Sequence, residues 1–105
     1  MNTNFETLSA TIDATSKTAF IHVDGTVMIY QDVKNVHFVK SVPQGIVENE
    51  LILDLVYDLV HPAMKGKLYS IERYSEMVLT TDRYKTVRVR IPNGEDKVVE
   101  VVIIQ

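Results

Sequence analysis

Three polar residues in the middle of the chain have types and a spacing that could support metal binding or acid–base catalysis. Asp54, Asp58 and His61 lie four and then three positions apart, so a helix would place them close to one line on its surface. Two carboxylates and an imidazole could hold a divalent cation or move a proton. Solvated acidic helix faces commonly have the same spacing. We therefore interpret these residues as a surface feature, and we predict no metal site and no catalytic residue.

The chain offers no other arrangement that is typical of an enzyme or of a cofactor-binding protein. Cysteine is absent, which excludes disulfides, thiolate ligands and a thiol nucleophile. His22 and His37 stand in apolar runs, where a hydrogen-bonded structural histidine is the commoner interpretation. The four glycines are isolated from one another, so they predict no phosphate-binding loop. We expect a non-catalytic protein without a cofactor.

The composition is typical of one globular domain that spans residues 1–105. Hydrophobic residues make up 46% of the chain and charged residues 24%, and a chain of this length can bury a core without disulfides or metals. No apolar run approaches the roughly 18 residues of a membrane helix. Residues 1–10 contain no basic residue and no apolar segment of the kind found in secretory signals. The sequence predicts a cytoplasmic protein with no membrane partner.

Charge is distributed unevenly along the chain. Residues 1–60 carry three basic and eight acidic side chains, whereas residues 61–91 carry seven basic and three acidic ones. Such polarity could orient a charged partner, or it could let two copies meet head to tail. Folding could instead mix both sets of charges on one small surface. The sequence leaves these two interpretations open.

The positive segment contains the residues that we predict to bind a partner. Tyr84, Arg88 and Arg90 are expected on one exposed face of a C-terminal strand, with Arg73 and Tyr74 beside them on the preceding strand. Arginine and tyrosine can hold phosphates and stack on bases, so RNA or single-stranded DNA is one candidate ligand. The same face carries aliphatic and acidic residues, and a mixture of Tyr, Arg and aliphatics is more typical of a protein–protein interface. We expect a small regulatory protein, such as an inhibitor or adaptor, with a protein partner of unknown identity.

The C-terminal hairpin is the clearest of the elements that would position these residues. Asn93-Gly94 is a hairpin-turn signal between two runs rich in Val and Ile. A three-residue loop at 93–95 would place Arg88 opposite Glu100, close enough for an ion pair. Because the last strand is strongly aliphatic, it should either lie inside the sheet or pair with its counterpart in a second copy. We expect a homodimer joined through this sheet.

Residues 47–60 predict the main helix of the protein. Their apolar residues recur at helical spacing and their acidic residues recur on the opposite side. The same segment also permits a strand, because several of its apolar residues alternate. Residues 20–30 predict a hairpin that turns at Asp24-Gly25, and residues 35–42 predict a further strand.

Two segments fit both a helix and a strand. For residues 7–14 we favour a strand, because Thr-rich polar positions alternate with apolar ones. Residues 68–80 are ambiguous, and we interpret 69–80, 84–91 and 97–104 as three strands of a meander. The sequence as a whole predicts an α+β fold. It would consist of an antiparallel sheet of five or six strands with the 47–60 helix packed on one face.

Overall fold

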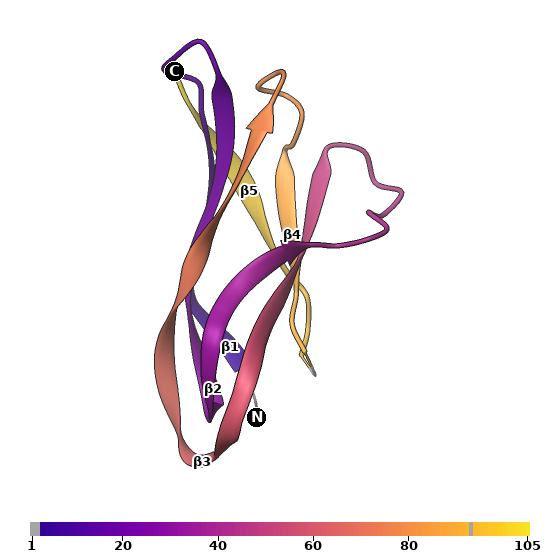
Figure 1. The fold of residues 1–105 in the computed structure, drawn as a ribbon. Helices are drawn as coiled ribbons and strands as arrows, with labels where there is room; N and C mark the ends of the chain where they lie inside the picture. The colour runs from indigo at the N-terminus through magenta and orange to yellow at the C-terminus, as the bar shows by residue number, and fades with distance from the viewer. Residues whose placement is uncertain (1–2, 93) are drawn as a thin grey trace.

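The computed structural model describes residues 3–92 and 94–105, which form a closed barrel of five strands (Figure 1). The strands are β1 (Thr3–Asp13), β2 (Ala19–Lys40), β3 (Glu50–Val78), β4 (Thr86–Arg90) and β5 (Lys97–Ile104). No helix occurs among the described residues. The predicted α+β class with a helix at 47–60 is therefore wrong, and the fold is all-β. It follows that this part of the chain holds no helix with the length and apolar character to cross a membrane.

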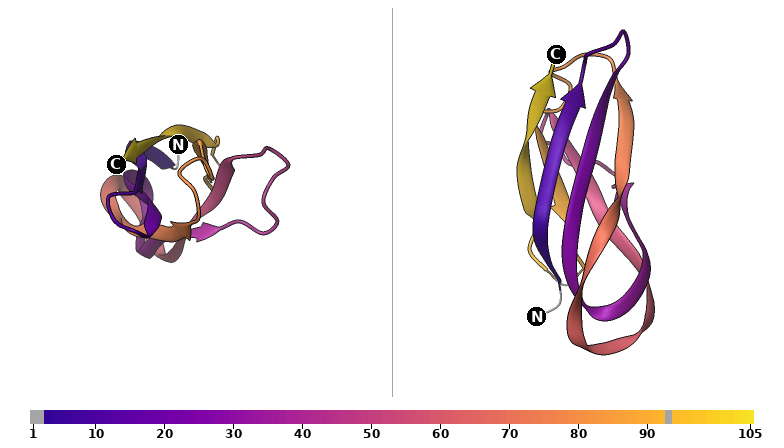
Figure 2. Two further views of the ribbon diagram at one scale, coloured as in Figure 1. Left: turned by 90° about the horizontal axis from the view of Figure 1, so that it is seen from above. Right: turned by 90° about the vertical axis from the view of Figure 1, so that its left-hand side faces the viewer.

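The two long strands, β2 and β3, form one antiparallel ribbon that folds back on itself. They contain 22 and 29 residues, far more than the usual five or six of a strand. The ribbon bends where the pairing steps from Ile29–Lys67 to Gln31–Pro62. Figure 1 and the right-hand view of Figure 2 show this bend at the lower end of the molecule. Each long strand thereby contributes two segments to the barrel wall.

The remaining pairings close the barrel. The N-terminal part of β2 pairs with β1, and the start of β3 pairs in parallel with β4. The folded ribbon also meets itself, because His37 of β2 pairs with Glu72 as well as with Val56 of β3. β5 lies between β1 and β4, so it takes the internal position that was one of the two expectations for this strand. It pairs with β4 over residues 97–100 and with β1 over residues 101–104.

The core is filled by side chains at alternate strand positions. In β3, Leu51, Leu53 and Leu55 point into the barrel and are almost completely buried. Ile52 faces the other way, yet it is only 9% exposed because the loop before β3 lies over it, with Gly45 in close contact. This coverage accounts for the consecutive apolar residues 51–53 on which the wrong helix prediction partly rested, whereas Leu59 of the same pattern is exposed. A strand that is buried on both faces has apolar residues at consecutive positions, and these also satisfy a helical period.

The predicted hairpin at 20–30 is also wrong, because Asp24 and Gly25 lie inside β2. The register of β2 against β3 shifts between Val23 and Gly25, which marks an irregularity in the ladder. A Cβ atom at Gly25 would stand 2.8 Å from the Thr7 carbonyl oxygen of β1. Glycine is therefore explained here by a close backbone approach rather than by a turn. The strand predictions for 7–14 and for 35–42 are confirmed, in that 7–13 belong to β1 and 35–40 to β2.

The C-terminal hairpin is confirmed, but its register differs by two residues. Arg88 pairs with Val98, and Glu100 pairs with Thr86. A shift of two preserves the faces, so Val87 and Val89 are buried as expected. The predicted turn residue Asn93 lies outside the described residues. The predicted meander is wrong, since β4 pairs in parallel with the start of β3 and not with residues 69–78.

Candidate functional site

The five residues predicted to bind a partner do not form one surface. Arg88 and Arg90 lie on the outer side of β4, as expected. Arg73 lies on the distant second half of β3, where it contacts Asp24. Tyr84 belongs to the linker between β3 and β4 and is only 2% exposed. Tyr74 is half-buried on β3, and its hydroxyl binds the same residue as the hydroxyl of Tyr84.

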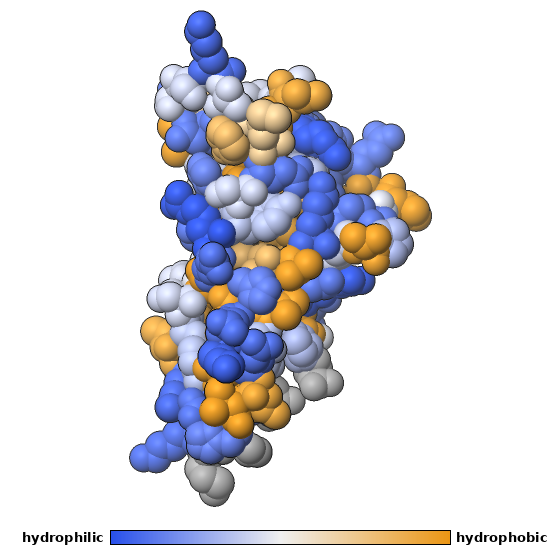
Figure 3. Space-filling model, viewed as in Figure 1, coloured by the Kyte–Doolittle hydropathy of each residue, from blue (hydrophilic) through white to orange (hydrophobic). Residues whose placement is uncertain are grey.

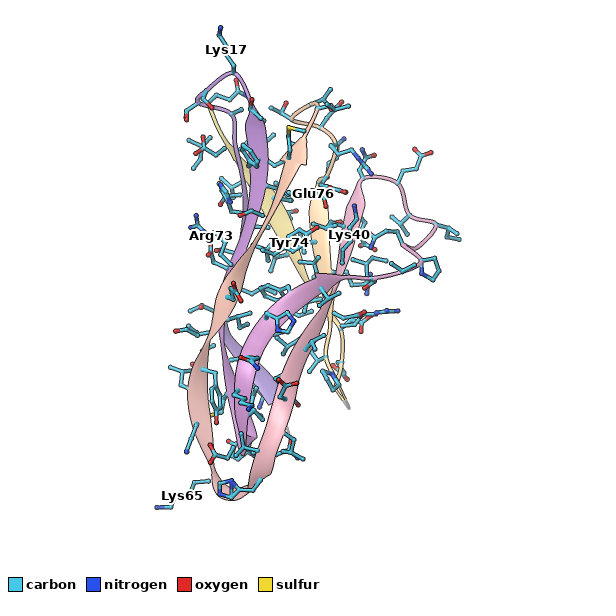
Figure 4. All side chains as sticks on the ribbon, viewed as in Figure 1. Lys17, Lys40, Lys65, Arg73, Tyr74 and Glu76 are labelled. Atoms are coloured by element: carbon cyan, nitrogen blue, oxygen red, sulfur yellow. The ribbon has the colours of Figure 1, made fainter. Side chains whose placement is uncertain are left out.

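That shared partner is Glu76, which lies at the centre of a polar cluster. The hydroxyl of Tyr74 donates to Glu76 Oε1 and the hydroxyl of Tyr84 donates to Glu76 Oε2, each at 2.6 Å. Lys40 Nζ lies 3.1 Å from Glu76 Oε1 and donates to the Tyr84 hydroxyl at 3.2 Å. Figure 4 shows Lys40, Tyr74 and Glu76 close together, whereas Arg73 projects elsewhere. The guanidinium of Arg83 covers the Tyr84 ring, 4.4 Å from its centre.

The charges and hydrogen bonds of this cluster indicate a structural role. Burial acts to raise the pKa of Glu76, but the hydrogen bonds from Tyr74, Tyr84 and Lys40 outweigh it and lower the pKa. Burial likewise acts to lower the pKa of Lys40, and its bonds to Glu76 and Tyr84 raise it instead. Burial and the nearby carboxylate raise the pKa of both tyrosines. Both carboxylate oxygens accept hydrogen bonds, and the cluster joins the ends of β2 and β3 to the linker before β4.

The remaining predicted arginines are neutralised by carboxylates. Arg73 Nε lies 2.8 Å from Asp24, Arg88 Nε lies 3.2 Å from Glu50, and Arg90 Nε lies 2.7 Å from Asp54. Arg88 also contacts Asp96, so the predicted ion pair with Glu100 is replaced by two others. Each of these three arginines comes from the positive segment, and its main partner comes from residues 1–60. Folding has therefore mixed the two sets of charges that the sequence keeps apart.

The carboxylates and histidine that could have supported metal chemistry are also separated. Asp54 binds Arg90, Asp58 accepts a hydrogen bond of 2.7 Å from Asn35, and His61 lies 3.2 Å from Asp32. In the described ranges no three side chains of the metal-binding types come together. An extended strand rises about 3.3 Å per residue, so residues four and seven positions apart lie far from one another along it, which explains the separation.

The most exposed apolar group of the molecule lies on the loop between β2 and β3, residues 41–49. Val42 is 91% exposed, Ile46 101% and Val47 60%. Figure 1 shows this loop projecting from the side of the barrel, and Figure 3 shows apolar side chains at its tip. Isolated exposed aliphatic residues are normal on a protein surface. Three on one projecting loop of nine residues form a small patch, which calls for an explanation.

Two polar side chains fasten this loop to the barrel. The amide of Gln44 donates to the carbonyls of Ser41 and Ile52, and its oxygen accepts from the Ile52 N–H, all at 2.8 Å. The side-chain amide of Gln44 thus makes with the Ile52 backbone the two hydrogen bonds that a neighbouring strand would make. At the other end of the loop, Asn49 donates to the carbonyls of Asp82 and Arg83, and its own carbonyl accepts from Lys85. The exposed aliphatic residues are therefore carried on a loop that is anchored at both ends.

A second exposed apolar region covers the outer side of the sheet at the end where β1 and β5 finish. We call it the apolar face, and it consists of Phe20, Met77, Leu79, Val102 and Ile104, all of them exposed. The strand register aligns most of these residues, since Ile104 pairs with Asp13, Asp13 with Phe20, and Phe20 with Met77. Two positions further along each strand, the paired residues on the same side of the sheet are Val102, Thr11, His22 and Ser75. Asp13 lies between Ile104 and Phe20 in the first of these two rows, so this end of the outer sheet surface carries one carboxylate among its apolar side chains.

Comparison of the chain with protein-family models, with curated proteins and with solved structures gave no match in any of the three. The candidate site therefore stands on the geometry of this chain alone. Sequence reasoning missed the loop, although Pro43-Gln44-Gly45 interrupts the preceding strand. The Ile46-Val47 pair that follows belongs to no strand, and this was the signal available in the sequence.

Proposed function

We propose that this chain is a small non-catalytic binding protein that acts through protein–protein contact, with the loop 41–49 as its main contact. The observation that carries the proposal is the display of Val42, Ile46 and Val47 in solvent on a loop held by Gln44 and Asn49. Aliphatic anchors on a preorganised loop lose little conformational entropy on binding, and their burial in a partner's pocket is favourable. Few charges need to be desolvated, since Glu48 is the only charged residue of this loop.

The predicted anchors Arg88 and Arg90 fit at the edge of this surface. Arg88 is bound to Glu50, the residue that directly follows the loop, and Arg90 is bound to Asp54 in the same strand. Residues at the rim of an interface are usually polar and hydrated, whereas the centre is apolar. We therefore assign the centre to the loop and the rim to these two ion pairs. Tyr74 and Tyr84 act instead in holding the barrel together.

Nucleic-acid binding is the weaker candidate, because the arginines that would contact phosphates already contact carboxylates. Binding to phosphates would require these ion pairs to be broken, and the acidic partners would then repel the ligand. The net charge of −3 points in the same direction.

Site-specific photo-crosslinking tests the proposed function. A photoreactive phenylalanine analogue replaces Ile46 in the protein expressed in its source cells, and a matched control carries it at Leu59, which is exposed on β3. We expect a discrete protein adduct from position 46 and none from position 59. Unlabelled wild-type protein in excess should suppress the adduct, and an Ile46→Asp variant in excess should not. Absence of an adduct at position 46, or equal labelling at both positions, would contradict the proposal.

A further inference from the structure

We propose that Glu76 is a positioning residue for the loop 41–49, because its carboxylate holds the residues that fix both ends of this loop. The inference rests on the proposed function, since it names the group that keeps the binding loop in place. The hydrogen bonds and the ion pair of Glu76 go to Lys40, Tyr74 and Tyr84, none of which belongs to the loop. Glu76 must therefore act on the loop through the residues that flank it.

The first connection reaches the start of the loop. Lys40 is the last residue of β2, so the loop begins at the residue that follows it. The ammonium of Lys40 lies 3.1 Å from Glu76 Oε1 and donates to the Tyr84 hydroxyl at 3.2 Å. Figure 4 shows Lys40 beside Glu76 at this end of β2. The path of the chain into the loop is therefore tied to the carboxylate.

The second connection reaches the end of the loop through the linker between β3 and β4. Asn49 binds this linker on both sides of Tyr84. Its side chain donates to the carbonyls of residues 82 and 83, and its own carbonyl accepts from the N–H of Lys85 at 2.7 Å. Tyr84 in between is held by its buried ring and by the bond of 2.6 Å from its hydroxyl to Glu76. Asn49 has a φ of 62°, and such a left-handed conformation of a residue other than glycine persists where the surrounding contacts hold it.

Both ends of the loop therefore converge on one carboxylate. Lys40 and Tyr84 contact each other as well as Glu76, so the three side chains connect the end of β2, the end of β3 and the linker. When the carboxylate is removed or protonated, the ammonium loses its ion pair and the Tyr84 hydroxyl loses a charged acceptor. The two ends of the loop then move more freely, and the exposed aliphatic residues between them must be ordered again on binding.

Distance measurements on a spin-labelled loop test the inference. The chain contains no cysteine, so Ile46→Cys and Leu59→Cys allow one label on the loop and one at an exposed position of β3. We expect double electron–electron resonance at pH 7 to give a narrow distance distribution in this labelled chain. A further Glu76→Gln change should broaden the distribution severalfold.

Two further variants separate the role of this cluster from a general loss of stability. Lys40→Met removes the ammonium of a side chain that is 39% exposed, so the variant should fold, and its distribution should also be broad. Asp24→Asn is the matched control, because it removes a carboxylate that binds Arg73 and touches neither end of the loop. Its distribution should stay narrow. Circular dichroism checks that each variant is folded.

The pH profile separates the charge of Glu76 from a merely structural effect of its side chain. The groups that face the carboxylate are Lys40 from β2, Tyr74 from β3 and Tyr84 from the linker, with Arg83 over the Tyr84 ring. The pKa of Glu76 is lowered from 4.5, whereas the pKa values of Lys40 and both tyrosines are raised, so these three keep their protons when Glu76 gains one. Without the Glu76→Gln change, the distribution should broaden as the pH falls through the folded-state pKa of Glu76. With Glu76→Gln it should be broad at every pH.

Two distance results would overturn the inference, namely a Glu76→Gln distribution that stays narrow and an equal broadening in Asp24→Asn. Crosslinking from position 46 then tests the link to binding. Glu76→Gln should lower the yield of the adduct severalfold and Asp24→Asn should not, so an unchanged yield in Glu76→Gln would also contradict the inference. If position 46 gives no adduct in the wild type, the proposed function fails, while the distance distributions still decide whether Glu76 positions the loop.

Discussion

The hydroxyl of Tyr84 donates a hydrogen bond of 2.6 Å to Glu76 Oε2 and thereby joins the β3–β4 linker to the end of β3. The folded ribbon meets itself nearby, where His37 of β2 pairs with Glu72 of β3. At Glu76 itself, three side chains converge from the end of β2, from β3 and from the linker, namely Lys40, Tyr74 and Tyr84. A partly buried hydrogen-bonded network of this kind helps to fix the relative positions of the elements that it connects. Side-chain hydrogen bonds and one ion pair therefore hold these parts of the barrel together.

Removal of the Tyr84 hydroxyl should destabilise the fold measurably. In Tyr84→Phe the ring still fills its buried site, but Glu76 loses one donor and Lys40 loses one acceptor. We expect the free energy of unfolding to fall by about 1–2 kcal/mol, as measured by urea denaturation. Tyr30→Phe is the matched control, because Tyr30 is exposed and no hydrogen bond involves its hydroxyl within the described part of the chain. Equal losses in the two variants would argue against the fastening role.

The stabilising effect of Glu76 should depend on pH. Its pKa in the folded protein is lowered below the usual 4.5, so its ionised form stabilises the fold above pH 4.5. That contribution is lost as the pH falls through the folded-state pKa. Glu76→Gln has no ionisable group at this position. We therefore expect wild type to be more stable than Glu76→Gln at pH 7, with a difference that shrinks steadily below pH 4.5. A difference that stays constant from pH 7 to pH 3 would contradict the assignment.

Local signals in the sequence predicted individual strands better than their arrangement. The alternation in residues 7–14 and the Val-rich arms of the C-terminal hairpin both reflect one buried and one exposed face, and both strands exist. Asp24-Gly25 is as good a turn signal as Asn93-Gly94 in isolation, yet it lies within a continuous strand. The difference arises from Thr7, whose backbone lies against Gly25 in the folded barrel. Such a non-local contact leaves no mark within the segment itself.

Replacement of Gly25 tests this interpretation. In Gly25→Ala the new Cβ would lie 2.8 Å from the Thr7 carbonyl oxygen, so β1 and β2 must move apart. We expect a loss of about 1–3 kcal/mol in the free energy of unfolding, as is typical of overpacking. Gly45→Ala is the matched control. There the new Cβ would meet the end of the flexible Ile52 side chain at the same distance of 2.8 Å, and that side chain can move. A larger effect at Gly45 than at Gly25 would contradict the close-approach explanation.

The candidate site shows a similar limit of sequence reasoning. Arg88 and Arg90 were placed correctly on the outer side of a strand, because the register shift of two preserves the faces. Their ion pairs with Glu50 and Asp54 could not be predicted, since they depend on the parallel pairing of β4 with a segment that was expected to be helical. Tyr84 lies two residues before β4 and continues its alternating pattern, but it is in the linker and is buried. Sequence alternation cannot indicate where a strand begins.

The loop 41–49 should lose its order when the amide of Gln44 is replaced. Gln44→Glu keeps the length of the side chain but replaces the donor with a charged oxygen that faces the carbonyls of Ser41 and Ile52. Both of those bonds are lost and the new charge repels the carbonyls, which should outweigh the bond that a Glu oxygen can still accept from the Ile52 N–H, so the loop should detach from β3. We expect amide exchange at Ile52, measured by hydrogen–deuterium exchange, to become at least tenfold faster, whereas exchange at the core residue Leu53 should change little. Crosslinking of position 46 to the proposed partner should weaken in the same variant, because an unanchored loop must be ordered again each time it binds. Unchanged protection at Ile52 would mean that Gln44 does not hold the loop, and the preorganisation on which the proposed contact depends would have to come from Asn49 and from the Ser41 N–H, which donates to the Ile52 carbonyl.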